Sequence, residues 1–255
     1  MKNMLRSSIR LILIIVFSIS FSCATTQKEQ ERSKEAEAYL NLGNEYAAKG
    51  QRDYAISTYT KALEMNPKYV EAYNNRGIAL AARGQYDEAI IDYTKALAIN
   101  PRYVEAYSNR GIAFTSKGRY DQAISDYTRA LEINPRYVEA YNNRGNAYLN
   151  KGQYDNAISD YNKALQIDPW PATTYYNRGT AYIAKGQYDQ AIVDLNRAIE
   201  GNPRFALAYN SRARAYYLKK SYAESWNDVA RAQDLGFQVP QDFLDSLRKA
   251  SGRQR

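Results

Sequence analysis

Proline recurs at a constant spacing of 34 residues along most of this chain, and no other feature limits the fold as strongly. A glycine or alanine follows ten residues after each of these prolines, and Gly43 marks an earlier copy of the pattern. A fixed period of this length indicates one small structural unit repeated in tandem. The prolines are Pro67, Pro101, Pro135, Pro169 and Pro203, and the repeats are predicted at 36–69, 70–103, 104–137, 138–171, 172–205 and 206–239.

Each repeat contains two apolar stretches with the period of a helix, separated by a short polar turn. In the second repeat the first stretch holds Tyr73 and Leu80, the second holds Ala89 and Tyr93, and Gly84 lies in the turn between them. Asparagine or aspartate followed by proline closes the second stretch, because proline ends a helix and disfavours a helical residue before it. Each repeat is therefore predicted to be a helix hairpin.

These residues resemble the tetratricopeptide repeat family, which has the same period and a recurring pattern of glycine, aromatic residue, alanine and proline. The resemblance covers about four fifths of the chain. It implies an all-α fold, a right-handed superhelical solenoid of six helix hairpins whose first helices line a concave groove. In the second repeat the pattern is met by Tyr73, Gly77, Leu80, Tyr86, Ala89, Tyr93, Ala96 and Pro101.

The end of the array departs from the repeat pattern. The sixth repeat lacks the Asn-Pro pair, and Pro240 opens a short amphipathic segment with Phe243, Leu244 and Leu247 on one side. A stack of hairpins needs a cap on its last apolar face. Residues 240–255 are therefore predicted to form a capping helix and a tail.

Five repeats carry an arginine directly before the central glycine or alanine, where the family usually has leucine. The same five carry an aspartate in the second helix, whereas the first repeat has Leu42 and Thr58 at these two places. This co-occurrence predicts that each arginine pairs with the aspartate of its own repeat, and that the pairs fix hairpin geometry more than they add stability. The alternative is that the charges are solvated and recur only because one unit was copied. The predicted pairs are Arg76 with Asp92, Arg110 with Asp126, Arg144 with Asp160, Arg178 with Asp194 and Arg212 with Asp228.

Residues 1–22 have the organisation of an export signal peptide. Lys2, Arg6 and Arg10 form a basic start, and the apolar or small-residue run that follows is short for a membrane span. The run ends at Cys23, the sole cysteine. Residues 23–35 are polar and show no apolar period, so a tether is predicted there.

A cysteine at this place resembles the bacterial lipoprotein signal, in which the thiol is acylated and becomes the first mature residue. Ser22 fits the cleavage pattern, whereas Ser20 stands where leucine is usual. The alternatives are secretion into the periplasm or medium after cleavage near Ala24, and an uncleaved anchor. The resemblance implies a lipid-anchored protein of the bacterial envelope, and alanine rather than aspartate at position 24 favours the outer membrane, facing the periplasm.

Composition excludes several functional classes. The chain has no histidine, which excludes imidazole acid–base chemistry and most zinc sites. It contains no phosphate-binding loop and no nucleophile elbow. The formal charge of +8 is spread over the repeats, unlike the concentrated basic footprint of nucleic-acid binding. We therefore expect a non-enzyme with no cofactor, no metal and no nucleic-acid partner.

The family resemblance places a ligand groove on the first helices. The implied positions are rich in asparagine, which offers donors and acceptors to an extended peptide backbone. Chaperone-binding grooves of the family use a lysine and asparagine clamp, but Asn74 and Asn142 stand where lysine would be needed, so that activity is not expected. The alternative is that the asparagines belong to the repeat pattern and bind no ligand. The implied groove residues are Asn41, Asn44, Asn74, Asn75, Asn109, Asn142, Asn143, Asn146, Tyr176, Asn177 and Arg214.

Taken together, these features predict a non-catalytic scaffold for protein–protein interactions, exported and lipid-anchored. Its groove would bind peptide segments of envelope proteins, in a role similar to that of pilotins or envelope assembly factors. Two alternatives stay open: a scaffold for polysaccharide export or cell-wall enzymes, and self-association of the nearly identical repeats. The repeats specify the shape of a surface and leave its partner undefined.

Overall fold

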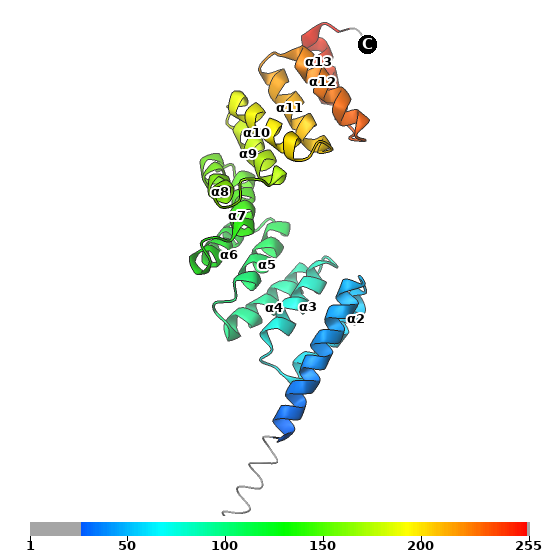
Figure 1. The fold of residues 1–255 in the computed structure, drawn as a ribbon, viewed down its shortest axis with the longest axis vertical. Coiled ribbons are helices and arrows are strands. Elements are labelled where there is room, and N and C mark those ends of the chain that lie inside the picture. Colours follow the sequence, from blue (N-terminus) through cyan, green and yellow to red (C-terminus); the bar gives the residue numbers. More distant parts are fainter. Residues whose placement is uncertain (1–26, 254–255) are drawn as a thin grey trace, which may run out of the picture. The chain divides into compact units, whose positions relative to one another are not determined.

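The computed structural model describes residues 27–253, and every regular element within that range is a helix (Figure 1). No helix in this range is both long and apolar enough to cross a membrane. The first helix covers 27–48, and it is followed by α2 (Arg52–Met65), α3 (Val70–Ala81), α4 (Tyr86–Ile99), α5 (Val104–Ser116), α6 (Tyr120–Ile133), α7 (Val138–Asn150), α8 (Tyr154–Ile167), α9 (Ala172–Ala184), α10 (Tyr188–Gly201), α11 (Ala206–Leu218), α12 (Tyr222–Asp234) and α13 (Gln241–Ser251).

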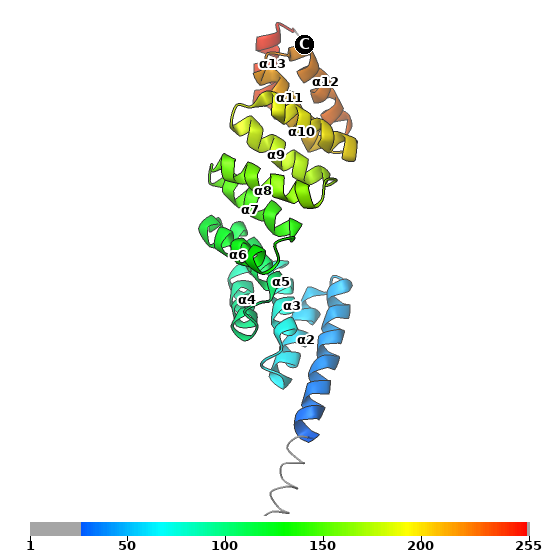
Figure 2. The same cartoon turned by 60° about the vertical axis from the view of Figure 1, so that its left-hand side comes forward.

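Consecutive helices pack as hairpins. Helix α3 packs on α4, α7 on α8, α9 on α10 and α11 on α12, and neighbouring hairpins contact each other through pairs such as α2 with α3 and α8 with α9 (Figure 2). The predicted all-α array of helix hairpins is therefore confirmed. The chain divides into two compact units, unit 1 up to Asn109 and unit 2 from Arg110 onward, and the division lies within α5.

The segment predicted as a tether differs from the expectation. Residues 27–35 are helical and continue directly into the first repeat, while residues 1–26, with the predicted signal and Cys23, lie outside the described residues. The prediction relied on the lack of an apolar period and neglected helix propensity. This stretch contains no glycine or proline and is rich in Glu, Lys, Gln and Arg, which favour a helix. Arg32 also donates from Nη2 to the carbonyl of Glu64 in α2 at 3.3 Å, which ties the extension to the first hairpin.

The turn within each hairpin requires one residue with a left-handed backbone. After α7, Gly152 has φ of 73° and donates its N–H to the carbonyl of Leu149 at 2.9 Å. The N–H of Gln153 donates to the carbonyl of Tyr148 at 2.9 Å. These bonds satisfy carbonyl groups that the helix end would otherwise leave unpaired. In the sixth repeat Lys220 adopts this conformation, with φ of 63°.

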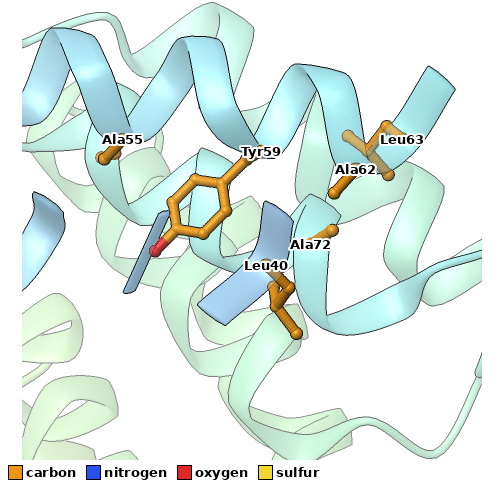
Figure 3. Packing of buried hydrophobic residues seen from close by; sticks show 7 residues of the cluster. Leu40, Ala55, Tyr59, Ala62, Leu63 and Ala72 are labelled. Atoms are coloured by element: carbon orange, nitrogen blue, oxygen red, sulfur yellow. The ribbon is translucent and has the colours of Figure 1, made fainter. Parts of the chain in front are cut away.

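The two helices of a hairpin meet where a glycine on the first faces an aromatic ring on the second. A Cβ atom added to Gly145 would lie 2.6 Å from Cε1 of Tyr161, and one added to Gly77 would lie 2.6 Å from Cε1 of Tyr93. Figure 3 shows the equivalent ring, Tyr59, among the alanine and leucine side chains of the first core cluster. Glycine is therefore required here by the closeness of the helices.

The residues of this contact change size together along the chain. A Cβ atom at Gly179 would lie 3.0 Å from Cγ of Leu195, which leaves more room than the tyrosine rings do. In the sixth repeat the two places hold Ala213 and Val229, which belong to one core cluster. A larger residue on the first helix thus accompanies a smaller one on the second, as close packing requires.

Helix α13 covers the last hairpin, where the sequence predicts a cap. Leu247 is fully buried and Leu244 is nearly so, and both share a core cluster with Val229 of α12. Phe243 packs edge-on against Tyr217, with ring centroids 5.6 Å apart. The apolar side of α13 therefore closes the core of the sixth repeat.

Replacing Gly145 with alanine is expected to lower the free energy of unfolding by about 1–3 kcal/mol, because the added methyl group overlaps the ring of Tyr161. Combining Gly145→Ala with Tyr161→Val, the kind of pair found in the sixth repeat, is expected to recover part of this loss. Urea unfolding followed by circular dichroism measures both effects. A double variant that loses the full sum of the single losses would contradict the steric explanation.

Candidate functional site

Each of the five arginines on the first helices binds the aspartate of its own hairpin through two nitrogens. In the fourth repeat, Nε of Arg144 on α7 donates to Oδ2 of Asp160 on α8 at 2.7 Å, and Nη2 donates to Oδ1 at 2.8 Å. Such a bidentate contact fixes both side chains in one orientation. The same geometry, at 2.7–2.8 Å, joins Arg76 to Asp92, Arg110 to Asp126, Arg178 to Asp194 and Arg212 to Asp228.

The third guanidinium nitrogen reaches the preceding repeat, a contact that the sequence analysis did not predict. Nη1 of Arg144 donates to Oγ1 of Thr128 on α6 at 2.9 Å, and Nη1 of Arg178 donates to Oδ1 of Asn162 on α8 at 2.6 Å. Each of these arginines thus connects its own hairpin to the one before it. The same contact joins Arg76 to Thr60 and Arg212 to Asn196.

The first and last repeats each lack one half of this contact. Leu42 replaces the arginine in the first repeat, and the hydroxyl of Thr58, in place of the aspartate, donates to the carbonyl of Tyr54 at 2.6 Å. The sixth repeat has Ala230 where the others have threonine or asparagine. A sequence signal existed: a threonine or asparagine lies sixteen residues before each arginine, and an aspartate lies sixteen residues after it.

The charges of these pairs are largely shielded from solvent. Side-chain exposure is 17% for Arg144 and 7% for Asp160, which does not fit the alternative of freely solvated charges. Burial by itself would lower the pKa of Arg144, but the hydrogen bonds and charge of Asp160 raise it above its usual value. In the third repeat, burial raises the pKa of Asp126 in spite of the hydrogen bond from Arg110. Desolvation and attraction are therefore close to balance, as the sequence analysis expects of such pairs.

A second set of ion pairs joins neighbouring repeats at the surface. Lys151 binds Asp121 and Lys185 binds Asp155, in each case from the end of a first helix to the start of the preceding second helix. The aspartate side chains are 84% exposed, so each pair contributes little to stability. These pairs were not predicted from the sequence, although the 30-residue separation between the partners recurs.

The asparagines of unit 1 bind one another. The hydroxyl of Tyr59 donates to Oδ1 of Asn44 at 2.8 Å, and Nδ2 of Asn75 donates to the same atom at 3.0 Å. Nδ2 of Asn74 donates to Oδ1 of Asn75 at 3.2 Å, and Nδ2 of Asn109 donates to Oδ1 of Asn74 at 3.0 Å. This chain of amides crosses three repeats. It satisfies internally many of the polar groups that were predicted to face a ligand.

A pocket of about 370 Å³ lies beside this amide chain in unit 1. Its walls are mostly apolar, with Asn44 and Asn75 supplying polar groups, so it could receive a side chain of a docked segment. The lining residues are Asn44, Ala47, Arg52, Tyr59, Asn75, Ile78, Ala79 and Ala82.

The asparagines of unit 2 are used differently. Oδ1 of Asn146 accepts from the hydroxyl of Tyr161 at 2.7 Å, and Nδ2 of Asn142 donates to the carbonyl of Val138 at 3.2 Å. Within residues 27–253, Asn143 and Asn177 make no side-chain hydrogen bond. Both are half-buried, and their helices α7 and α9 contact each other. Unit 2 therefore keeps amide groups that a ligand could use.

The remaining predicted groove residues have mixed surroundings. Asn41 and Arg214 are exposed on their first helices. Tyr176 is half-buried and packs on Phe205, with ring centroids 4.9 Å apart, so this ring contributes to the core of the fifth repeat.

Models of one repeat family match most of the chain. Models described as TPR repeat match residues 43–82, 111–152 and 179–220, and models described as tetratricopeptide repeat match residues 70–103, 138–171 and 92–125. Together the matched segments cover more than half of the sequence. No protein of curated function matches it.

Several solved structures are similar to this chain. MamA is 30% identical with a TM-score of 0.61, and the match covers 68% of this chain and 94% of MamA. YrrB, described as a TPR protein with an unusual peptide-binding site, is 27% identical with a TM-score of 0.60, over 72% of this chain and 94% of YrrB. PilF of Pseudomonas aeruginosa is 19% identical with a TM-score of 0.69, over 88% of this chain and 100% of PilF, a likeness that shows the fold alone.

The variant Asp160→Thr is expected to lower the free energy of unfolding by about 3 kcal/mol, because it leaves the guanidinium of Arg144 buried without its counter-charge. The double variant Arg144→Leu/Asp160→Thr copies the residues of the first repeat and is expected to regain most of that loss. Urea midpoints of both variants measure the difference. If the double variant is as unstable as the single one, the buried charge is not the cause.

Proposed function

The chain belongs to the tetratricopeptide repeat family, and from this premise we propose that it is a non-catalytic scaffold that docks segments of partner proteins on its first helices. The observation that carries the proposal is the pair of unused amides on neighbouring helices, Asn143 on α7 and Asn177 on α9. A half-buried amide without an internal partner retains its donors and its acceptor for a ligand.

Peptide backbone is the ligand chemistry that these amides fit. An extended segment presents carbonyl and N–H groups at regular intervals, and an asparagine amide can pair with either kind. Hydrogen bonds to backbone do not require a particular side chain, so specificity would come from pockets beside the amides. YrrB, described as having a peptide-binding site, supports the proposal by its similarity over most of its length.

We also propose that the protein acts in the bacterial envelope. A basic start, an apolar run and a sole cysteine at position 23 support export and a lipid anchor in the bacterial envelope. The scaffold would then meet its partners near a membrane surface, in a pilotin-like or assembly role. The helical extension over 27–35 continues directly into the first repeat.

The double variant Asn143→Ala/Asn177→Ala is expected to bind peptides selected on the wild-type protein about tenfold more weakly, because two hydrogen bonds to the backbone are lost. The peptides come from a displayed random twelve-residue library, and fluorescence anisotropy measures their affinity. The melting temperature should stay unchanged, because neither side-chain amide forms a hydrogen bond within residues 27–253.

The matched control is Asn75→Ala/Asn109→Ala, at the same repeat position in the second and third repeats. These amides belong to the internal chain of unit 1, so this variant is expected to melt at a lower temperature. Unchanged peptide affinity in the Asn143/Asn177 variant would overturn the proposed docking surface.

Cys23→Ala is expected to abolish incorporation of labelled palmitate when the protein is expressed in a Gram-negative bacterium, and to move the protein from the detergent phase to the aqueous phase of Triton X-114. Ser22→Ala keeps the cysteine and should retain both properties. A wild-type mature chain whose intact mass corresponds to an unmodified start near Ala24 would contradict the lipid anchor and support simple secretion.

A further inference from the structure

One face of α11 departs from the same face of every other first helix. Leu207, Ser211, Arg214 and Leu218 have the spacing of a single helix face, and we call them the α11 stripe. In the other repeats the place of Leu207 holds glutamate or threonine, that of Ser211 asparagine, that of Arg214 asparagine, isoleucine or threonine, and that of Leu218 alanine, serine or asparagine. Four changes on one face of an otherwise regular array indicate a local role.

The two leucines of the stripe contribute little to the fold. Leu207 is 44% exposed and Leu218 is 43% exposed, and neither belongs to the core clusters that contain Ala208 and Ala213 of the same helix. The first helices α3, α5 and α7 each have a glutamate in the first turn, which the helix dipole favours, whereas α11 has no acid there. Leucine in that place gives up a favourable charge without entering the core. Such a change is expected where another molecule binds.

Arg214 gives the stripe a positive charge that the described residues leave unpaired. It is exposed and forms no ion pair within residues 27–253. Neither α11 nor α9, which contacts it, contains an acidic residue. On α13, Asp245 pairs with Arg248 at 2.8 Å, and the two aspartates of this helix are matched by two basic residues. The stripe therefore combines two exposed leucines with one unpaired cation.

The other helices around α11 do not cancel this charge. On α10 all three carboxylates pair with basic residues, and on α12 Asp228 pairs with Arg212. Residues 206–251, which hold the sixth hairpin and the cap, carry seven basic and five acidic side chains. One of the seven, Lys219, is paired with Asp189 of α10, and the remaining basic residues still outnumber the acids. An unpaired arginine in these surroundings favours a carboxylate on the partner.

The stripe continues the face that carries the unused amides. In unit 1 the bond from Asn75 to Asn44 shows that this face of one first helix lies next to the same face of the preceding first helix. The corresponding places in the sixth and fifth repeats are Ser211 and Thr180. A segment bound at Asn177 on α9 would therefore extend onto α11, which contacts α9.

Helix geometry sets the spacing of the groups along α11. Leu207 and Arg214 are seven residues apart in sequence, about 10 Å along the axis, and Arg214 and Leu218 are four apart, about 6 Å. An extended chain advances about 3.3 Å per residue. A segment lying along α11 would therefore meet these three places with residues separated by three positions and then by two.

We propose that the α11 stripe selects the partner: an extended protein segment on the first-helix surface places an acidic side chain on Arg214 and aliphatic side chains on Leu207 and Leu218. The inference rests on the proposed function and adds the kind of segment that is bound. That segment carries an aspartate or glutamate, with one aliphatic residue three positions away on one side and another two positions away on the other side.

The test selects peptides from a displayed random twelve-residue library on the full-length protein. Peptides with an acid between two aliphatic residues at this spacing are expected to be enriched. Three variants place residues of other repeats at exposed positions and should therefore fold: Leu207→Glu, Arg214→Asn and Leu218→Ala. Each is expected to weaken the enriched peptides about tenfold in fluorescence anisotropy. Leu207→Glu should melt no lower than the wild type, because it returns an acid to the start of the helix.

Charge reversal isolates the role of Arg214. Peptides selected on Arg214→Glu should carry lysine or arginine where those selected on the wild type carry an acid. The matched control is Ile112→Glu, at the same place in the third repeat, which should leave the acid preference unchanged. An acid preference that persists in Arg214→Glu would overturn the proposal.

The Asn143→Ala/Asn177→Ala variant distinguishes this inference from the proposed function. Selected peptides that depend on these amides and show no acid preference would overturn the stripe and support the docking surface. Peptides that depend on Arg214 and not on the amides would support the stripe and overturn the amide contacts.

Two other occupants of the stripe would also overturn the proposal. One is a lipid surface, shown if the Cys23→Ala protein sediments with phosphatidylglycerol vesicles and Leu207→Glu abolishes this. The other is a second copy of the chain, shown by a dimer in analytical ultracentrifugation that Arg214→Glu dissociates.

Discussion

A guanidinium group bound on two sides is the interaction on which the stacking of these hairpins depends. Arg144 binds the aspartate of its own hairpin with two nitrogens and the threonine of the preceding hairpin with the third. The apolar contacts around it are made by small alanines and flat rings, which by themselves allow several helix crossing angles. Because desolvation offsets much of the attraction, the group adds less to stability than to a single geometry between repeats.

The fold was predictable because its requirements are local and recur. Proline near the end of the first five repeats, glycine opposite Tyr161 and its equivalents, and the joint presence of arginine and aspartate all follow from short-range sterics and charge. The contact from Arg144 to Thr128 was missed because a threonine on a helix usually bonds its own backbone. The helix over 27–35 was missed because polar residues can form a helix without an apolar side, and a bond from Arg32 to the next helix supports it.

The candidate site was less predictable, because equivalent asparagines have different hydrogen-bond partners. Asn75 finds an acceptor in Asn44, whereas Asn177, three repeats later at the same repeat position, finds none within residues 27–253. Residue type in the preceding repeat does not explain this difference, because Asn146 precedes Asn177 by the same 31 residues that separate Asn44 from Asn75, and each accepts from the equivalent tyrosine hydroxyl.

The unequal ends of the array have a consequence for its length. An inner hairpin has arginine on one side and threonine or asparagine on the other, so any number of such hairpins could be joined in series. The first hairpin offers Leu42 in place of a donor, and the last offers Ala230 in place of an acceptor. Two molecules brought end to end would therefore meet without the contact that joins repeats within one molecule. A contact that could in principle propagate as an open fibre thus stops at Leu42 and at Ala230, and at the second border α13 also covers the core of the last hairpin.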